Sequence, residues 1–475
     1  MTATLQAGSL LPWLRRSADA PPVPLRLALQ VGRARLAFDG AVSDLLGQRG
    51  LLGSYEISGP SLAAVGQPLR LTLPTTAPFA ARGRLAHDAG LWSTVLSSIS
   101  VGSSRLAGAF QVRQPGVGAG TGVPLLAGRL HGPVLVLQDL GPAVGVPLPG
   151  EAGARPPGAR VLPNRPLDLP SLRAMDANVL LAIDRLDPGS ALLQSVQPLR
   201  GQLLLHAGVL SLQGLDARLA QGRIAGWVQV DARHSPAQWS TDLRVAGLDI
   251  AQWIRPLRRA SGPPYASGRL GGRLVLQGRG RSTAELLASA DGQALLHWTR
   301  GSVSHLVVEA AGLDLAEALG VLLRGDKALA VTCGVADLQL RQGLVRPRLA
   351  LVDTPDSLLR LEGTVSLASE RLALVARVEP KDWSPLTLRT PLHIDGTLGQ
   401  PLVSLEKGPL ARRVLPAALL ALAAPLAALL PLFDAGEAGS DTSGRAAAAD
   451  CQAAAALWRA QRPPRKAPAT ARNSR

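Results

Sequence analysis

The clearest structural pattern in the chain is at Leu359–Val378, which reads LRLEGTVSLASERLALVARV. Alternate positions are aliphatic apart from one glycine: Leu359, Leu361, Gly363, Val365 and Leu367. Side chains of a β-strand point alternately to opposite faces, so these aliphatic groups share one face, and the polar residues between them share the other. Leu372, Leu374 and Val378 repeat the pattern after a turn at Ser369–Glu370. The stretch predicts a β-hairpin with one aliphatic and one polar face.

Similar hairpins recur along most of the chain and predict a mainly β protein. Residues 202–230 and 338–367 each show a strand, a glycine turn, another strand and a second glycine. Shifts in composition along the chain predict its division into units. We expect an irregular N-terminus at 1–23, a β-rich unit at 24–145, a Pro/Gly-rich linker at 146–171, a second β-rich unit at 172–412, an apolar helix at 413–433, and an Ala-rich helix with a basic disordered tail at 434–475.

Two short helices are expected between the strands. Ser282 with Glu285 has the spacing of a capping box, which predicts a helix over 282–290. Asp314 with Glu317 predicts another helix over 314–323 by the same reasoning.

The uncharged segment Val414–Phe433 is long enough to cross a bilayer. Its leucines recur at steps of four and three with alanine between them, which suits a helix that docks on a sheet or in a groove. Pro416, Pro425 and Pro431 would kink or break a spanning helix. The segment therefore docks, lies at a membrane interface or spans the membrane.

The formal net charge of +16 and the pI near 11.3 raise the possibility of nucleic acid or an anionic membrane as a partner. Aromatic residues make up only 3% of the chain, which leaves few side chains on which bases could stack. The basic charge is nearly all arginine spread along the polar faces of strands. We expect no nucleic-acid partner.

Residues with the spacing of a catalytic or metal site do not stand out in the sequence. The seven histidines are scattered, and no CxxC, HExxH or GxSxG occurs. The glycine-rich stretch 115–122 lacks the lysine of a phosphate loop and is best interpreted as a hairpin tip. We expect no enzymatic activity, no metal and no cofactor.

Several short segments carry a resemblance to a known family. From Cys333 the order is a strand ending in Ala336-Asp337-Leu338, a turn at Gly343, a strand ending in Asp353-Thr354, then Glu379–Asp382, Leu388–Pro391, Gly396–Leu398 and Pro401. Further segments lie at Gly59–Leu62, Leu71–Pro78, Val101–Gly108, Leu137–Pro142 and Arg160–Leu169. This series resembles the AsmA family of Gram-negative envelope proteins, and 172–412 is similar to its C-terminal domain.

The resemblance implies a long twisted antiparallel β-sheet or groove with a few short helices and a C-terminal Ala/Leu helix. It also implies a location in the periplasm or at the inner membrane, and a role in phospholipid transport or outer-membrane biogenesis, as in bridge-like lipid-transfer proteins. Such proteins usually begin with a membrane helix. Residues 1–16 show neither that helix nor a signal peptide, so we expect a truncated start or a different location.

The two cysteines, Cys333 and Cys451, could form a disulfide in an oxidising compartment or be two small thiols. The family resemblance favours the disulfide to some extent, because similar proteins tend to carry a cysteine near each place.

These observations lead to the hypothesis of a non-enzymatic envelope protein that binds lipid acyl chains in a hydrophobic β-groove. The candidate groove residues are Leu203, Leu205, Val228, Val230, Leu274, Leu276, Leu349, Leu351, Leu361, Val365, Leu367, Leu372 and Leu374. The expected partners are phospholipid or another membrane lipid, the inner and outer membrane surfaces, and outer-membrane assembly proteins. Ordinary packed core is the simpler interpretation of any one of these residues. The alternative function is a scaffold that assists outer-membrane proteins by β-strand pairing.

Overall fold

The computed structural model describes residues 2–8, 22–44, 49–66, 73, 75–88, 90–114, 122–144, 160–189, 194–253, 266–304, 328–355, 357–381, 391–405, 451–453 and 456. The helices predicted at 314–323 and 413–433, the first part of the linker and most of the C-terminal tail lie outside these residues.

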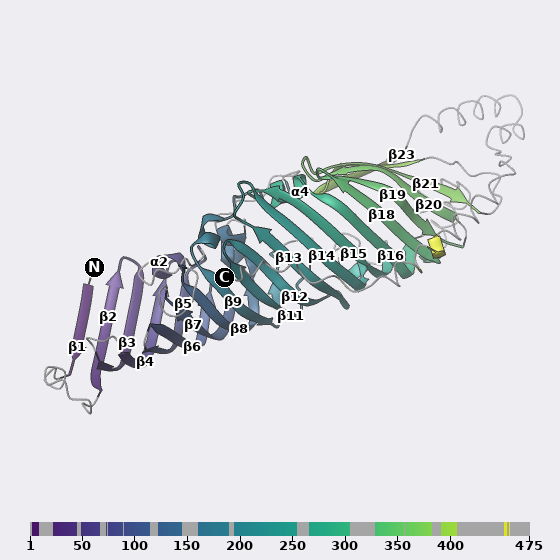
Figure 1. Cartoon of the computed structure of the whole chain (residues 1–475). Helices are drawn as coiled ribbons and strands as arrows, with labels where there is room; N and C mark the ends of the chain where they lie inside the picture. The colour runs from purple at the N-terminus through teal and green to yellow at the C-terminus, as the bar shows by residue number, and fades with distance from the viewer. Residues whose placement is uncertain are drawn as a thin grey trace, which may run out of the picture.

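One sheet contains all the strands of the described residues (Figure 1). Its first part comprises β1 (Thr2–Ala7), β2 (Val23–Val31), β3 (Ala34–Asp44), β4 (Arg49–Gly59), β5 (Phe79–Asp88), β6 (Leu91–Val101), β7 (Ser104–Arg113) and β8 (Leu125–Val136). Its second part comprises β9 (Asp176–Ile183), β10 (Leu186–Asp187), β11 (Leu199–His206), β12 (Val209–Leu219), β13 (Gly222–Asp231), β14 (Ala237–Asp249), β15 (Ala266–Gly280), β16 (Asp291–Ser304), β17 (Ala328–Val331), β18 (Cys333–Arg341), β19 (Leu344–Asp353), β20 (Ser357–Ser366), β21 (Arg371–Pro380), β22 (Leu392–Thr397) and β23 (Gln400–Leu405). The prediction of a mainly β fold on one long sheet with few short helices is confirmed.

The sheet is mixed, whereas the sequence predicted an antiparallel one. Nearly all neighbours are antiparallel hairpin partners, but β9 pairs in parallel with β8, and so does the short β10. A parallel pair needs a crossover connection, which the long segment between β8 and β9 provides. The expected antiparallel order was wrong at this junction because a strand pattern does not record the direction of its neighbour.

The hairpin turns form two long rims of the sheet. Rim A contains the turns at 32–33, 102–103 and 220–221, and rim B contains the turns at 207–208, 342–343 and 369–370. β8 ends at rim A and β9 begins at rim B, so the connection between them changes rims. We use these two names below.

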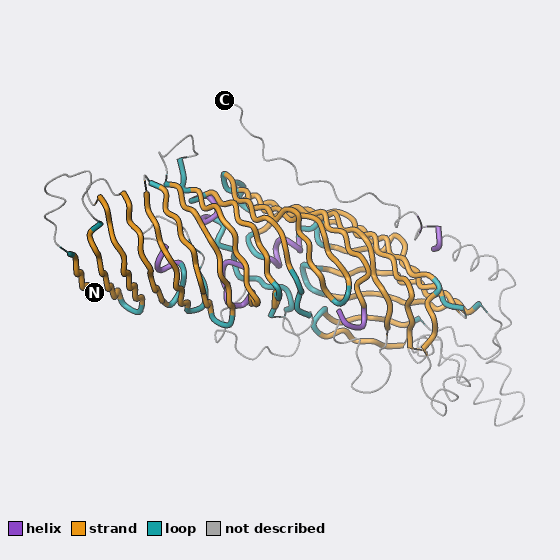
Figure 2. The backbone as a smooth tube through the Cα atoms, turned by 90° about the horizontal axis from the view of Figure 1, so that it is seen from below, coloured by secondary structure: helices purple, strands orange, loops and turns teal. Residues whose placement is uncertain are grey.

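Short helices lie against the ends of strands (Figure 2). They are α2 (Ala63–Gly66), η2 (Leu137–Val144), η3 (Pro170–Arg173), α3 (Ile250–Trp253) and α4 (Thr283–Ala288). The predicted cap of α4 is confirmed, since the Ser282 side chain accepts a hydrogen bond from the Glu285 amide. The Glu285 carboxylate accepts from the Arg281 amide at 2.8 Å, which satisfies a second N–H at this helix start.

The strand β1 lies where the sequence predicted irregular structure. Its six residues are all exposed and it pairs with β2 alone among the described strands. Ala3, Leu5 and Ala7 give an alternation too weak to indicate a strand without its neighbour β2.

Candidate functional site

The strand register separates the sheet into an apolar face and a polar face. Residues that lie opposite each other in an antiparallel pair share a face. Leu27 pairs with Phe38, Phe38 with Tyr55, and Leu203 with Leu212, and the series continues to Leu361 opposite Ala376. We call this the apolar face. Apart from Asp44 and Arg49 at one strand end, the described positions of β2–β22 that register with it carry no Asp, Glu, Lys or Arg.

Burial on the apolar face is highest at the strand ends. There the helices pack on it, as Trp253 of α3 does with Leu219 and Leu248 at rim A, and Leu172 of η3 with Met175 and Leu205 at rim B. At the strand centres the aliphatic side chains are only half-buried, for example Leu203, Val228 and Leu361. Within the described residues, therefore, the strand centres have no second layer packed fully over them.

Most of the predicted groove residues lie on this face. Those at half-buried positions are Leu203, Val228, Val230, Leu274, Leu276, Leu361, Val365, Leu372 and Leu374. Leu205 is also on this face, but it is 7% exposed and belongs to the packed cluster at rim B. Leu367 follows the end of β20, where its amide donates to the Gly343 carbonyl at 2.8 Å.

Leu349 and Leu351 lie on the polar face, so their assignment to the groove was wrong. The register of β19 shifts around Arg348: Pro347 opposes Leu338, whereas Leu349 opposes Asp337. This one-residue bulge reverses the faces of the residues that follow it. Leu351 packs instead with Cys333, Val335, Leu358 and Cys451, and Leu349 lies against that cluster. Cys333 and Cys451 form a disulfide there.

Glycines on the apolar face allow the strands to bend. Gly272 has φ of 158° and Gly363 has φ of 110°, and an added Cβ would lie 2.1 Å from the Leu295 carbonyl oxygen and 2.2 Å from the Ala373 carbonyl oxygen, respectively. Glycine kinks of this kind let a sheet curve where any side chain would clash with the neighbouring strand. The curvature of the sheet is visible along its length in Figure 2.

A few polar side chains interrupt the apolar face. The Tyr55 hydroxyl lies 2.8 Å from the Thr94 hydroxyl, and burial raises the pKa of the Tyr55 phenol above its ordinary value. The rings of His87 and Trp92 stack with their centroids 4.1 Å apart. Thr241 donates to the Trp227 carbonyl at 2.7 Å. These groups are uncharged or weakly basic, so the described strands place no strong ionic group near the centre of this face.

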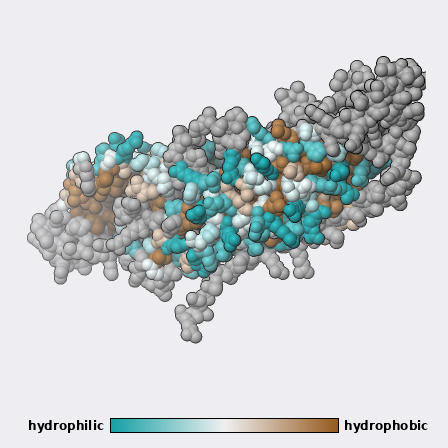
Figure 3. Space-filling model, turned by 90° about the horizontal axis from the view of Figure 1, so that it is seen from above, coloured by the Kyte–Doolittle hydropathy of each residue, from teal (hydrophilic) through white to brown (hydrophobic). Residues whose placement is uncertain are grey.

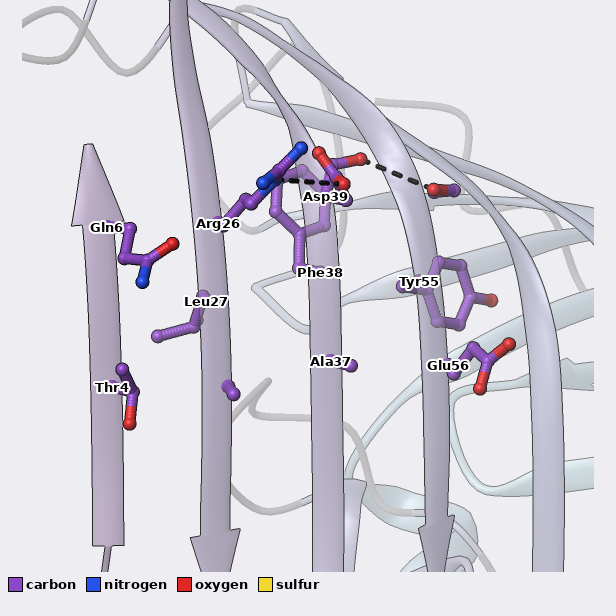
Figure 4. Close-up of a pocket in the computed structure, with 11 residues that line it drawn as sticks. Thr4, Gln6, Arg26, Leu27, Ala37, Phe38, Asp39, Tyr55 and Glu56 are labelled. Atoms are coloured by element: carbon purple, nitrogen blue, oxygen red, sulfur yellow. Dashed lines mark hydrogen bonds and ion pairs between the residues drawn. The ribbon is translucent and has the colours of Figure 1, made fainter. Parts of the chain in front are cut away.

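The polar face carries the ion pairs of the sheet. A cavity of about 430 Å³ lies on its N-terminal strands and is lined by residues that include Thr4, Gln6, Ala28 and Glu56. Arg26 pairs with Asp39 there, at 3.2 Å (Figure 4). Both partners of this pair are more than half exposed, so the pair contributes little to stability.

Seen from above, apolar residues gather at the N-terminal strands on the left, while hydrophilic residues cover much of the central surface (Figure 3).

The described residues contain no group of three or more His, Cys, Asp or Glu side chains that could hold a metal ion. Among those same residues, none of the helices has the length and apolar character needed to span a membrane.

Comparison with known proteins agrees with the architecture. The model of the AsmA family matches residues 119–350. Over 459 residues the chain is 30% identical to AsmA family protein YhjG of Escherichia coli (strain K12). This chain belongs to the AsmA family. The match covers 92% of the chain and 64% of the relative, so the chain spans less than two thirds of that AsmA protein's length. No solved structure matches the chain significantly. AsmA membership indicates a function connected with the Gram-negative cell envelope.

Buried carboxylates explain the form of two AsmA-like segments, a role that the sequence did not reveal. In the first, Asp139 of η2 is 1% exposed and accepts from the Ser103 and Ser104 amides at 3.0 and 2.8 Å. It therefore fixes the turn of one segment, Val101–Gly108, to the helix of another, Leu137–Pro142. Both segments stood out in the sequence by their resemblance to the AsmA family. Their contact could not be predicted, because Ser104 and Asp139 are 35 positions apart in the chain.

In the second case Glu370, which is 2% exposed, accepts from the Val161 and Leu162 amides at 2.5 and 3.1 Å. Its other partner is Arg160, with 3.4 Å between Nε and Oε1. From there residues 160–173, which we call the strap, run along rim B. The Pro163 carbonyl of the strap accepts a hydrogen bond from the Ala284 amide of α4. At the end of the strap, the Arg173 guanidinium donates to the Ala232 carbonyl. The strap thus joins strand ends from β21 back to β13.

Proposed function

We propose that this AsmA protein is a non-enzymatic component of the cell envelope that binds lipid acyl chains on its apolar face. Phospholipid or another membrane lipid is the ligand. By passing lipid between the inner and outer membrane surfaces, the protein contributes to phospholipid transport and outer-membrane biogenesis.

The observation that carries this proposal is an uncharged face whose aliphatic strand centres are half-buried in the described part of the chain. Water-exposed apolar surface of this extent is unfavourable by about 25 cal/mol per Å². Soluble proteins rarely leave such surface open unless it meets a partner. Acyl chains offer apolar surface without hydrogen-bonding demands, and they match a face that offers few polar groups.

The test is to express the full chain in a periplasm, purify it without detergent and measure bound phospholipid by mass spectrometry. The informative variant is Leu361→Glu with Val365→Glu, because both side chains are half-buried on the apolar face. Two carboxylates there would be desolvated by bound acyl chains, so we expect at least about a tenfold loss of lipid. Thr364→Glu is the matched control, since it adds a charge to the polar face of the same strand.

Near-stoichiometric lipid in the wild type and the control, with loss in the double variant, would support the proposal. Unfolding of the double variant in circular dichroism would show that the apolar face is packed core. A folded wild type that carries no lipid would reject acyl-chain binding.

The second candidate function is a scaffold for outer-membrane proteins that works by strand pairing. The observation in its favour is β1, whose residues are exposed and uncharged, with Leu5 at 65% exposure. Edge strands without charge or proline are templates for added strands. A β-strand peptide that binds the protein equally well with and without excess lipid would favour this function.

A further inference from the structure

Four polar-tipped side chains form an island on the apolar face of β4, β5 and β6. His87 lies directly opposite Trp92, and Thr94 follows Trp92 by two positions on the same face of β6. Tyr55 of β4 reaches Thr94 through the 2.8 Å contact between their hydroxyls. We call these four residues the polar island. It stands out because its neighbours on this face include Phe38, Leu85 and Phe110.

The two hydroxyls of the island satisfy each other. Thr94 Oγ1 donates to the Arg84 carbonyl at 3.1 Å, so its single proton is used. The Tyr55 hydroxyl must then be the donor in its contact with Thr94. Both protons therefore have acceptors within the protein.

The ring nitrogens of His87 and Trp92 have no hydrogen-bond partner in the part of the chain that the structure describes, although His87 is only 7% exposed. Two other tryptophans on this face behave differently. Trp239 Nε1 donates to the Leu286 carbonyl and Trp298 Nε1 donates to the Ser267 carbonyl, each at 2.9 Å. Neither residue has a nitrogen among the described side-chain atoms that are fully buried without a partner, so these nitrogens reach the surface of the apolar face. The His87–Trp92 pair therefore presents N–H groups that have no acceptor in the described protein and are open to a ligand.

We propose that His87 and Trp92 bind the ester carbonyl oxygens of a glycerolipid whose acyl chains lie on the apolar face. This inference rests on the proposed lipid-binding function and names the chemical class of its ligand. An indole N–H and a neutral imidazole N–H are both donors, and an ester carbonyl is a neutral acceptor that can be buried beside them at low cost.

The position of the pair on the strands agrees with this ligand. His87 is the second-last residue of β5 and Trp92 is the second residue of β6, so both lie near rim B. A lipid whose carbonyls met this pair would extend its chains over Leu85, Leu96 and the strand centres. Its headgroup would pass the rim into water, where a charge costs least.

The experiment compares two phosphatidylethanolamines with equal chain lengths, one a diester and the other a diether that lacks both carbonyls. Competition between them for the purified full chain is measured by native mass spectrometry. We expect the wild type to prefer the diester by on the order of threefold to tenfold, the size expected for one or two hydrogen bonds. Trp92→Phe and His87→Phe should each reduce the preference, because each keeps an aromatic ring on the apolar face and removes the ring N–H donor.

Thr241→Val is the matched control. It removes a hydroxyl from the same face. Because the Thr241 hydroxyl already donates to the Trp227 carbonyl, it does not bind the lipid in this proposal, and the diester preference should persist. A wild type that binds both lipids equally, or ring variants that keep the preference, would overturn the inference and leave acyl-chain binding intact. A wild type that binds neither lipid would overturn both.

Discussion

Single buried carboxylates hold distant segments of this protein together. Asp139 and Glu370 each accept two backbone N–H groups from another segment, and both are almost fully buried. Hydrogen bonds to an ionised acceptor are roughly twice as strong as neutral ones. The sequence predicted the turn at Ser369–Glu370, but it could not predict the role of Glu370, because the residue that it binds lies 209 positions earlier.

Glu370→Gln should release the strap from rim B. An amide can accept one of the two N–H groups, but its NH2 would face donors, so we expect a local loss of about 1–3 kcal/mol. Trypsin cleavage of the native protein after Arg160 and Arg173, at the two ends of the strap, should then accelerate several-fold. Glu362→Gln is the control, since Glu362 is half-exposed on the polar face and pairs with Arg377 at 3.5 Å. Equal cleavage of both variants and the wild type would show that Glu370 does not secure the strap.

At the scale of the strand, hydrophobic alternation predicted the elements well and their faces less well. It located the hairpin at Leu359–Val378, and the capping-box spacing located the cap of α4, because both patterns depend on neighbours within a few residues. The groove assignment failed at Leu349 and Leu351, because a bulge at Arg348 shifts the phase and a run of alternating leucines does not reveal it. Pro347 was the available signal, since proline in a strand often accompanies a bulge.

Gly363→Ala should destabilise the C-terminal hairpins. Its φ of 110° is nearly inaccessible to alanine, and the new Cβ would lie 2.2 Å from the Ala373 carbonyl oxygen. We expect a loss of at least about 2 kcal/mol in the free energy of unfolding, seen as an earlier midpoint in urea. Gly122→Ala should leave the midpoint unchanged, because an added Cβ there meets no atom within 4 Å. Similar midpoints for the two variants would contradict the proposed role of glycine in bending the strands.

At the scale of the whole molecule, the sequence predicted one long sheet. It left the Cys333–Cys451 disulfide open as one of two alternatives, and it did not predict the other contacts between remote segments. Hairpin pairing is local, and each strand pattern suggested its own neighbour. The parallel junction of β8 with β9, the strap and the Cys333–Cys451 disulfide all join segments that are remote in sequence. No period in the sequence contains that information.

Replacement of both cysteines by alanine should lower the thermal unfolding midpoint. The disulfide joins residues 118 positions apart, for which loop-closure entropy predicts a contribution of about 3–5 kcal/mol. Reductant should shift the wild type toward the midpoint of the double variant and leave the variant itself unaffected. A wild type that melts at the same temperature as the variant under oxidising conditions would show that the bond contributes nothing to stability.

The strap also has a consequence for the order in which the protein folds. A chain that is made or exported from its N-terminus presents residues 160–173 well before Glu370, its anchor, has emerged. Each hairpin from β11 to β21 can form as it appears, because its two strands are adjacent in sequence. The strap cannot dock until the last of these hairpins exists, since contacts of high sequence separation form late. Its docking would therefore report that the sheet behind it is complete.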